Sequence, residues 1–362
     1  MKKNRKPVRV LIVDDSASVR QILARELGRD PEIEIVGTAG DPYIARDKIL
    51  SEKPDVLTLD IEMPRMDGIT FLRKLMIYHP MPVIVLSSLA AHGTRVALDA
   101  LEYGAIEIFA KPACDVENGL AVSMQRLAHA VKAAGRVRVK SAAPLAHDHV
   151  VVKNTTPSVL HTTDKVIAIG ASTGGTEALK TVLTRMPPDC PAILVVIHMP
   201  EGFTNRYAER LNAICNIEVH EAADGDWLHA GVALIARGDS QLILTRSGAR
   251  YRVRVQKGPA VCQHRPSVEV LFQSAAQAAG PNAMGVIMTG MGADGANGLL
   301  KMRQAGAYTV AQNEESCVVF GMPKEAIELG GAVDVLPLDE IPGACMRWSH
   351  SGTHTRVGGL KT

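Results

Sequence analysis

Polar side chains of three kinds follow short apolar runs in the first third of this chain. These residues are Asp14, Asp15, Asp60, Ser87 and Lys111. Carboxylate oxygens are the ligands that Mg²⁺ prefers in proteins, and ammonium and hydroxyl groups neutralise the oxygens of a phosphoryl group. A fold that brings these residues together would form a site for a hard cation beside a space for phosphate.

A second set of reactive residue types lies beyond residue 164. Ser172 is the serine of a G-x-S-x-G segment, His198 directly follows an apolar run, and Asp294 lies in a glycine-rich loop after another run. A hydroxyl nucleophile, an imidazole base and an orienting carboxylate are the three groups of nucleophilic acyl transfer. The order Ser, His, Asp differs from the Ser, acid, His order of the α/β-hydrolases, so a different fold would have to assemble them.

Each feature also has a plainer interpretation when it is taken alone. An aspartate or serine after a strand is common as a helix N-cap, and a lone histidine is more often structural than catalytic. The glycine-rich loop can also be read as G-x-G-x-x-G at Gly290, Gly292 and Gly295, a dinucleotide-binding pattern. Asp294 would place a negative charge inside that loop, and the loop does not follow the domain's first strand, so the triad interpretation is favoured.

The elements that must position the first set alternate between strands and helices. Short apolar runs of this kind are typical of buried parallel strands, whose carboxyl ends form the ligand crevice of an open α/β sheet. We predict five strands and five helices in a doubly wound sheet. The runs named as strands are Val8–Val13, Val56–Leu59, Val83–Leu86 and Ile106–Ala110. The helices are Ser18–Leu27, Ile44–Ser51, Gly68–Tyr78, Thr94–Leu101 and Glu117–Val131.

The second set requires another α/β sheet. Parallel strands are predicted at Val166–Ile169, Ala192–Ile197, Ala283–Thr289 and Tyr308–Ala311, and antiparallel hairpins are predicted from Val232–Ala236, Leu242–Thr245 and Tyr251–Val255. Helices are expected to begin near Pro266 and Pro323. The expected organisation is a first domain at 1–125, a linker rich in Ala, Pro, Thr and basic residues at 126–163, a second domain at 164–349 and a flexible tail at 350–362.

Composition excludes several classes of protein. With 362 residues, 46% hydrophobic and 22% charged residues and a net charge of +2, the chain is of ordinary globular type and shows no bias toward nucleic acid. The six cysteines are scattered without a C-x-x-C pair, which favours a reducing compartment. No stretch approaches the ~20 apolar residues that span a bilayer, so we expect a cytoplasmic protein that is not inserted in a membrane.

The first domain resembles the receiver domains of two-component response regulators, which have the flavodoxin-like (βα)₅ fold. The matching segments are Leu11–Ser16, Leu59–Gly68, Leu86–Ser88 and Ala110–Pro112. The resemblance implies that Asp60 accepts a phosphoryl group from a phosphohistidine on a histidine kinase. It also implies that Asp14, Asp15 and Asp60 hold Mg²⁺, with Ser87 and Lys111 supporting the phosphate. In one departure, Ile108 occupies the position where many receivers have an aromatic switch residue.

The whole chain resembles the chemotaxis protein-glutamate methylesterase family, in which a receiver controls a catalytic domain. Matching segments in the second half are Gly170–Thr176, Ile197–Thr204, Arg265–Phe272, Thr289–Ala296 and Gly321–Pro323. The resemblance implies demethylation of glutamyl methyl esters and deamidation of glutamines on chemoreceptors, at receptor arrays and with no cofactor in the esterase site.

By the same resemblance, Ser172 is the nucleophile, His198 the base, and Asp294 its partner. The backbone N–H groups of Thr173 and Met291 are the expected oxyanion donors. The segment containing Arg237 and Gln241 departs from the family pattern, which usually has Pro and His at these positions.

Two other classes of protein remain as alternatives. A transcriptional response regulator would need a helix-turn-helix and a basic recognition surface, whereas residues 164–349 have an α/β pattern. A non-catalytic phospho-switch adaptor would use the Ser172 loop only to bind a ligand. Reaction with a serine-directed fluorophosphonate would distinguish the enzyme from the adaptor.

Overall fold

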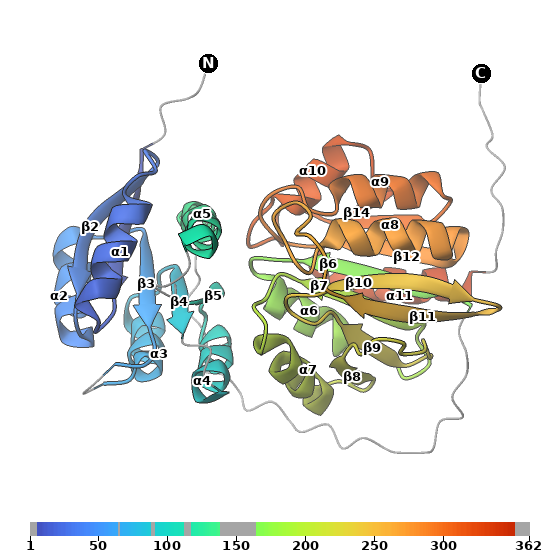
Figure 1. The fold of residues 1–362 in the computed structure, drawn as a ribbon, viewed down its shortest axis with the longest axis horizontal. Coiled ribbons are helices and arrows are strands. Elements are labelled where there is room, and N and C mark those ends of the chain that lie inside the picture. The colour runs from blue at the N-terminus through green and yellow to red at the C-terminus, as the bar shows by residue number, and fades with distance from the viewer. Residues whose placement is uncertain (1–5, 64–65, 88–90, 112–116, 138–163, 352–362) are drawn as a thin grey trace.

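The computed structural model describes residues 6–63, 66–87, 91–111, 117–137 and 164–351, which form two α/β domains side by side (Figure 1). Several sequence predictions fall outside these ranges. They concern Ser88, Pro112, most of the linker and nearly all of the tail. No helix in the described ranges combines the length and the apolar character needed to cross a bilayer.

The first domain is built on a five-stranded parallel sheet with the order β2-β1-β3-β4-β5, the flavodoxin-like order expected for a receiver. Its strands are β1 (Val8–Val13), β2 (Ile33–Ala39), β3 (Val56–Asp60), β4 (Val83–Ser87) and β5 (Glu107–Ala110). Every residue of β3 and β4 is buried, which explains their continuous apolar sequences.

Five helices cover the two faces of this sheet. They are α1 (Ala17–Leu27), α2 (Pro42–Glu52), α3 (Gly68–Tyr78), α4 (Ala91–Glu102) and α5 (Glu117–Ala134). Three of these helices have an N-cap side chain that accepts a hydrogen bond from a backbone N–H of the first turn. The N-cap residues are Ser16, Asp41 and Asp67. Since α1 begins directly after β1, its N-cap lies next to Asp14 and Asp15.

The second domain contains a seven-stranded parallel sheet with the order β14-β13-β12-β6-β7-β9-β8. Its strands are β6 (Val166–Ala171), β7 (Ala192–Ile197), β8 (Glu218–Glu221), β9 (Val232–Ile235), β12 (Ala283–Ile287), β13 (Tyr308–Gln312) and β14 (Asp334–Leu336). The chain starts in the central strand β6, extends the sheet to one side through β7, and then returns to build the other side from β12. The switch of direction therefore falls at β6, where ligand sites of open α/β sheets are found.

Helices lie on both faces of the second sheet. They are α6 (Gly175–Leu183), α7 (Phe203–Ile214), α8 (Val268–Ala278), α9 (Ala296–Gln304), α10 (Met322–Glu328) and α11 (Ile341–His350), with short 3₁₀ turns at Gly280–Asn282 and Leu338–Glu340. One hydrophobic core joins the sheet to α6, α7 and α11. A second core on the opposite face joins it to α8, α9 and α10, so the domain is doubly wound.

The prediction of several antiparallel hairpins was correct for only one pair of strands. β10 (Gln241–Ser247) and β11 (Arg250–Gln256) form a separate antiparallel two-stranded sheet. β9, in contrast, pairs in parallel with both β7 and β8. All four residues of β9 are buried, and its apolar sequence Val-Ala-Leu-Ile is that of a central parallel strand rather than a half-exposed hairpin.

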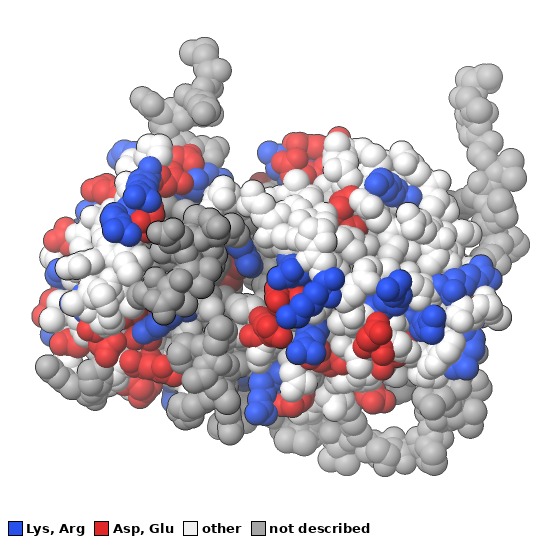
Figure 2. Space-filling view, in the orientation of Figure 1, with Lys and Arg blue, Asp and Glu red and all other residues white. Residues whose placement is uncertain are grey.

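Charged side chains of both signs are interspersed on the face of the molecule shown in Figure 2. On β11, the exposed Arg250, Arg252 and Arg254 alternate with the buried Tyr251 and Val253. This alternation follows from the two-residue period of a strand with one face on the core.

Candidate active site

Ser172 occupies the turn between β6 and α6. Its backbone N–H donates to the Thr289 carbonyl at 3.0 Å, which ties the turn to the segment that follows β12. Gly174 has φ of +77° at the N-cap of α6, a conformation that L side chains rarely adopt. Gly290 lies directly against the serine, since a Cβ on Gly290 would be 2.8 Å from the Ser172 Cβ. Glycine is therefore required on both sides of this turn.

The structure brings Ser172, His198 and Asp294 together at the carboxyl end of the sheet. The His198 Nδ1 lies 3.0 Å from the Ser172 Oγ, and the His198 Nε2 lies 2.7 Å from the Asp294 Oδ2. His198 and Asp294 are buried, whereas Ser172 is partly exposed. The hydroxyl, the imidazole and the carboxylate thus form a continuous hydrogen-bonded chain that ends at an accessible oxygen.

Asp294 accepts four hydrogen bonds from the start of α8 and from His198. Besides the imidazole, its donors are the Ser267 Oγ at 2.7 Å, the Val268 N–H at 2.8 Å and the Glu269 N–H at 3.0 Å. Burial alone would raise the pKa of Asp294, but the hydrogen bonds from His198, Ser267 and the α8 backbone outweigh it and hold the pKa below its ordinary value. The ionised carboxylate can orient the imidazole and stabilise its positive charge.

A cavity of about 360 Å³ opens beside Ser172 and is lined by residues of both domains. The predicted oxyanion donors, Thr173 and Met291, both line it. In the described part of the chain, neither of their backbone N–H groups donates a hydrogen bond to another residue. Two N–H groups beside a nucleophilic oxygen can stabilise the negative oxygen of a tetrahedral intermediate.

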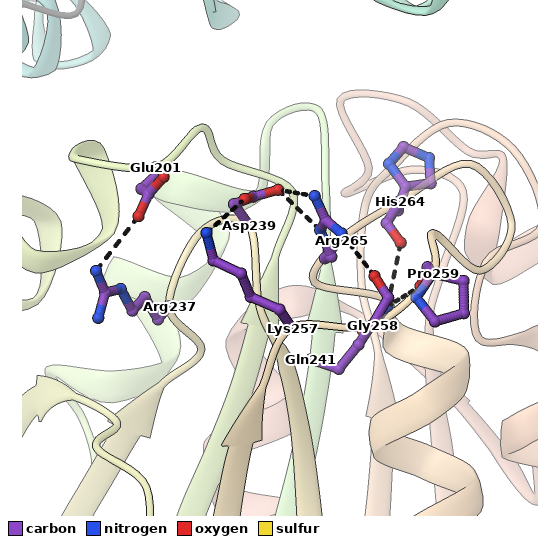
Figure 3. Close-up of polar contacts among 9 residues, drawn as sticks. All are labelled: Glu201, Arg237, Asp239, Gln241, Lys257, Gly258, Pro259, His264 and Arg265. Atoms are coloured by element: carbon purple, nitrogen blue, oxygen red, sulfur yellow. Dashed lines mark hydrogen bonds and ion pairs between the residues drawn. The ribbon is translucent and has the colours of Figure 1, made fainter. Parts of the chain in front are cut away.

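Gln241, one of the two departures from the family pattern, is buried beneath the loop that leads into α8. Its Oε1 accepts from the Ser267 N–H at 2.9 Å, and its Nε2 donates to the Pro259 carbonyl at 3.1 Å and to the His264 carbonyl at 3.5 Å. Figure 3 shows its side chain pointing toward this loop. Gln241 thus holds the segment that carries Ser267, an Asp294 donor.

Arg237, the other departure, lies at the surface. Its guanidinium contacts the Glu201 carboxylate at 3.3 Å, and both side chains are about half exposed (Figure 3). Exposed pairs of this kind contribute little to stability, typically ~0–1 kcal/mol. The two departures therefore differ in their contacts. Of the two residues, only Gln241 supports the loop next to Asp294, whereas Arg237 makes an exposed ion pair.

The first-domain residues also gather at the carboxyl end of their sheet. The Lys111 Nζ lies 2.6 Å from Asp60 Oδ2 and 3.2 Å from Asp14 Oδ2. Burial raises the pKa of Asp60 to about 6, with Lys111 opposing the shift and the charge of Asp14 adding to it. Asp14, Asp15 and Asp60 offer oxygen atoms that lie within 4.8 Å of one another.

This cluster fits a hard divalent cation. Two of its carboxylates are buried, Asp15 is exposed, and Lys111 supplies a single positive charge between them. An excess of negative oxygen donors at one sheet edge is the chemistry that Mg²⁺ binds, usually with several waters retained. Ser87 ends the adjacent strand β4, and its carbonyl accepts from the Lys111 N–H at 2.8 Å.

Three residues near the sites were not assigned a role from the sequence. Ser267 donates to Asp294, the ring of His264 lies on that of His198, and Glu107 of β5 accepts from the Thr173 hydroxyl at 2.6 Å. The sequence feature that could have identified Glu107 is its charge inside the otherwise apolar run Ile106–Ala110. Next to it, Ile108 is buried in the receiver core, whereas Phe109 lines the cavity between the domains.

The fold and the two sites define a class of protein, namely a response regulator whose output domain has the geometry of a serine hydrolase. Comparisons with known protein families support this class for each of the two domains. Residues 10–121 match the response regulator receiver domain family, and residues 167–345 match the family described as CheB methylesterase.

Relatives extend the similarity over the full chain. A protein-glutamate methylesterase/protein-glutamine glutaminase of group 3 operon from Rhodopseudomonas palustris is 54% identical over 95% of this chain and 97% of its own length. A protein named protein-glutamate methylesterase/protein-glutamine glutaminase 5 from Anaeromyxobacter dehalogenans is 55% identical over 94% and 97%. The crystal structure of the Thermotoga maritima CheB methylesterase catalytic domain, 38% identical, aligns with a TM-score of 0.50 over 51% of this chain and 98% of that chain. The chain belongs to the CheB methylesterase family.

The acidic cluster predicts stabilisation of the receiver by Mg²⁺ that depends on Asp15. At a concentration about ten times its Kd, Mg²⁺ should stabilise the folded receiver by ~1.4 kcal/mol, a rise of roughly 5 °C in its melting temperature. Asp15→Asn removes a charged ligand at an exposed position and should abolish most of this rise. Differential scanning calorimetry measures both, with Asp47→Asn on the exposed face of α2 as control. An equal rise in all three proteins would contradict the assignment.

The two departures from the family pattern predict unequal effects on stability. Gln241→Leu leaves the buried Ser267 N–H without its acceptor and should lower the free energy of unfolding of the second domain by ~1–3 kcal/mol. Arg237→Ala removes only an exposed ion pair and should change it by less than ~1 kcal/mol. Urea unfolding followed by circular dichroism compares the two variants, and equal losses would refute the supporting role of Gln241.

Proposed function

We propose that this chain is a phosphorylation-activated hydrolase that demethylates glutamyl methyl esters, and deamidates glutamines, on chemoreceptors and so serves sensory adaptation. The observation that carries the proposal is the chain of contacts from Ser172 through His198 to Asp294, at 3.0 and 2.7 Å, beside an open cavity. The names of the relatives from Rhodopseudomonas and Anaeromyxobacter supply the substrate class.

The first half of the proposed reaction forms an acyl-enzyme. His198 takes the Ser172 proton on Nδ1 while the serine oxygen attacks the side-chain ester carbonyl of the substrate. The N–H groups of Thr173 and Met291 donate to the oxyanion, and Asp294 stabilises the imidazolium through Nε2. His198 then gives its proton to the leaving methoxide, and methanol departs.

The second half resolves the acyl-enzyme with water. His198 accepts a proton from the water, the resulting hydroxide attacks the acyl carbon, and the Ser172 oxygen leaves with the proton from His198. With a glutamine substrate, the first leaving group is ammonia instead of methanol. These steps use side chains and backbone N–H groups only, so the proposal needs no cofactor in the esterase site.

The receiver supplies the proposed control. Asp60 accepts the phosphoryl group from a phosphohistidine of a chemotaxis-type histidine kinase. Asp14, Asp15 and Asp60 would hold Mg²⁺, which neutralises charge on the phosphoryl oxygens. Lys111 already contacts both buried carboxylates and would transfer an ion pair to the phosphoryl group, with Ser87 beside it.

Contacts between the domains support inhibition by the unphosphorylated receiver. Glu107 at the start of β5 accepts from the hydroxyl of Thr173, the proposed oxyanion residue. On the other side of the interface, Arg210 of α7 pairs with Asp99 and Glu102 of α4. Lys111 follows the other end of β5, so the phosphate site and the Glu107 contact share one short strand. Coupling of ~1–3 kcal/mol would change the rate about 5- to 150-fold.

The proposal also covers organisation and location. α5 continues to Ala134, so we place the end of the receiver near residue 137 rather than 125, followed by the linker to 163 and the catalytic domain at 164–349. The proposed partners are receptors and a histidine kinase, with no nucleic acid, and they locate the reaction in the cytoplasm at receptor arrays.

Loss of the nucleophile provides the direct test. Ser172→Ala should lower kcat for methanol release by roughly 10⁶-fold, because the triad acts as a unit. Asp60 phosphorylation should remain, since that site is in the other domain. Receptor membranes carrying labelled methyl groups, incubated with and without a phosphodonor, provide the assay. Ser51→Ala, an exposed serine on α2, is the matched control, and methanol release by Ser172→Ala would exclude Ser172 as the nucleophile.

The Glu107 contact predicts a pH-dependent inhibition. Removal from water between the domains raises the pKa of Glu107 from its ordinary 4.5 to about 7, although the Thr173 hydroxyl and Arg126 oppose the shift. The docked state therefore binds the proton more tightly, and the contribution of Glu107 to docking is lost as the pH rises through about 7.

Basal activity of the unphosphorylated chain should accordingly rise more steeply between about pH 5 and pH 7 than that of Glu107→Gln, which stays neutral, and the difference should level off above pH 7. The ratio of basal to phosphorylated activity is measured at each pH, with Glu34→Gln at an exposed position of β2 as control. Parallel profiles for the wild type and Glu107→Gln would show that Glu107 does not control docking.

A further inference from the structure

A second histidine ring lies face to face with the imidazole of the triad. The ring centroids of His198 and His264 are 3.6 Å apart, and the ring planes differ by only 5°. His264 comes from the loop between β11 and α8 and also lines the cavity beside Ser172. One face of the His198 ring is therefore covered by a parallel ring from a different part of the chain.

The loop holds His264 in this position through several contacts. The backbones of Val261 and His264 donate to each other at 3.0 and 2.9 Å, and the His264 carbonyl accepts from Gln241. The next residue, Arg265, contacts the Asp239 carboxylate and donates to the Gly258 carbonyl at 2.6 Å (Figure 3). The stacked ring is thus fixed by the backbone on which it is mounted.

His264 contributes its ring face here rather than hydrogen bonds from Nδ1. Its Nδ1 is enclosed by the protein and has no hydrogen-bond partner in the described part of the chain. Removal from water and the adjacent His198 lower the pKa of His264 far below its ordinary value, with further effects from Arg126, Asp294 and His129. His264 is therefore a neutral aromatic ring at neutral pH.

The Nδ1 of His198 contacts Ser172 and its Nε2 contacts Asp294, so only one orientation of the ring makes both contacts. Rotation about its side-chain torsions would separate Nδ1 from Ser172 and Nε2 from Asp294 together. A ring packed flat against one face resists that rotation. Its neutral π-face is also compatible with the positive charge that forms on His198 during acyl transfer, whereas a cation there would oppose it.

We propose that His264 is a positioning residue that fixes the reactive orientation of His198 by parallel ring stacking. This inference rests on the proposed hydrolase function. It assigns His264 no contact with the substrate and no proton transfer. A positioning role of this kind should alter kcat much more than KM, because the substrate still binds while the base is misaligned.

The test compares three variants in the phosphorylated full-length chain, with methanol release from methyl-labelled receptor membranes. His264→Ala removes the ring and should lower kcat about 10- to 100-fold with KM changed less than about threefold. His264→Gln keeps polarity without a ring and should behave like His264→Ala. His264→Phe restores a neutral ring and should return kcat to within about fivefold of the wild type.

Wild type and Ser172→Ala are run beside these variants, and Asp60 phosphorylation with circular dichroism checks folding. An active wild type with unchanged kcat in folded His264→Ala or His264→Gln would overturn the positioning role alone. His264→Phe as slow as His264→Gln would also overturn it, since a ring would then not suffice. A wild type that releases no methanol would overturn the proposed function and this inference with it.

Discussion

The buried carboxylate of Asp294 is the charge around which the second domain's site is organised. An ionised carboxylate removed from water must be compensated by hydrogen bonds, or the fold loses several kcal/mol. Four donors supply that compensation, from the end of β7 and from the first residues of α8. Because the same carboxylate holds the imidazole of His198, the condition for a stable fold and the condition for an oriented imidazole are met by one set of contacts.

A single short strand, β5, lies between the sites of the two domains. β5 carries Glu107 at its start and is followed by Lys111, so a strand of four residues, ~13 Å long, lies between the acceptor site and the crevice. Glu107 accepts from the side-chain hydroxyl of Thr173, and both residues line the cavity beside Ser172. A receiver docked through this strand touches the proposed oxyanion site directly, and in the proposed regulation phosphorylation would need to perturb only one short element to reach it.

Much of the fold was predictable because strand burial imposes a sequence pattern. Continuous apolar runs such as Val56–Leu59 and Ala192–Ile197 correctly indicated central parallel strands. The prediction failed at β9, where glycine and aspartate in the following turn suggested a hairpin. Pairing partners, unlike burial, are not encoded within a strand, and β9 finds both of its neighbours in parallel strands that end at Ile197 and Glu221.

In the sites, too, the sequence pattern predicts the positions of some residues, whereas the positions of others depend on tertiary contacts. Residues at strand ends can be inferred to converge, since the carboxyl ends of parallel strands meet at one edge, and Ser172 and His198 follow neighbouring strands. Ser267 and His264 reach the same crevice from a loop whose course depends on Gln241 and Arg265, and no periodicity reports that course. Glu107 comes from another domain altogether. The side chains that support Ser172, His198 and Asp294 are thus harder to predict from the sequence than these three residues, because their positions arise from tertiary contacts and not from the order of strands.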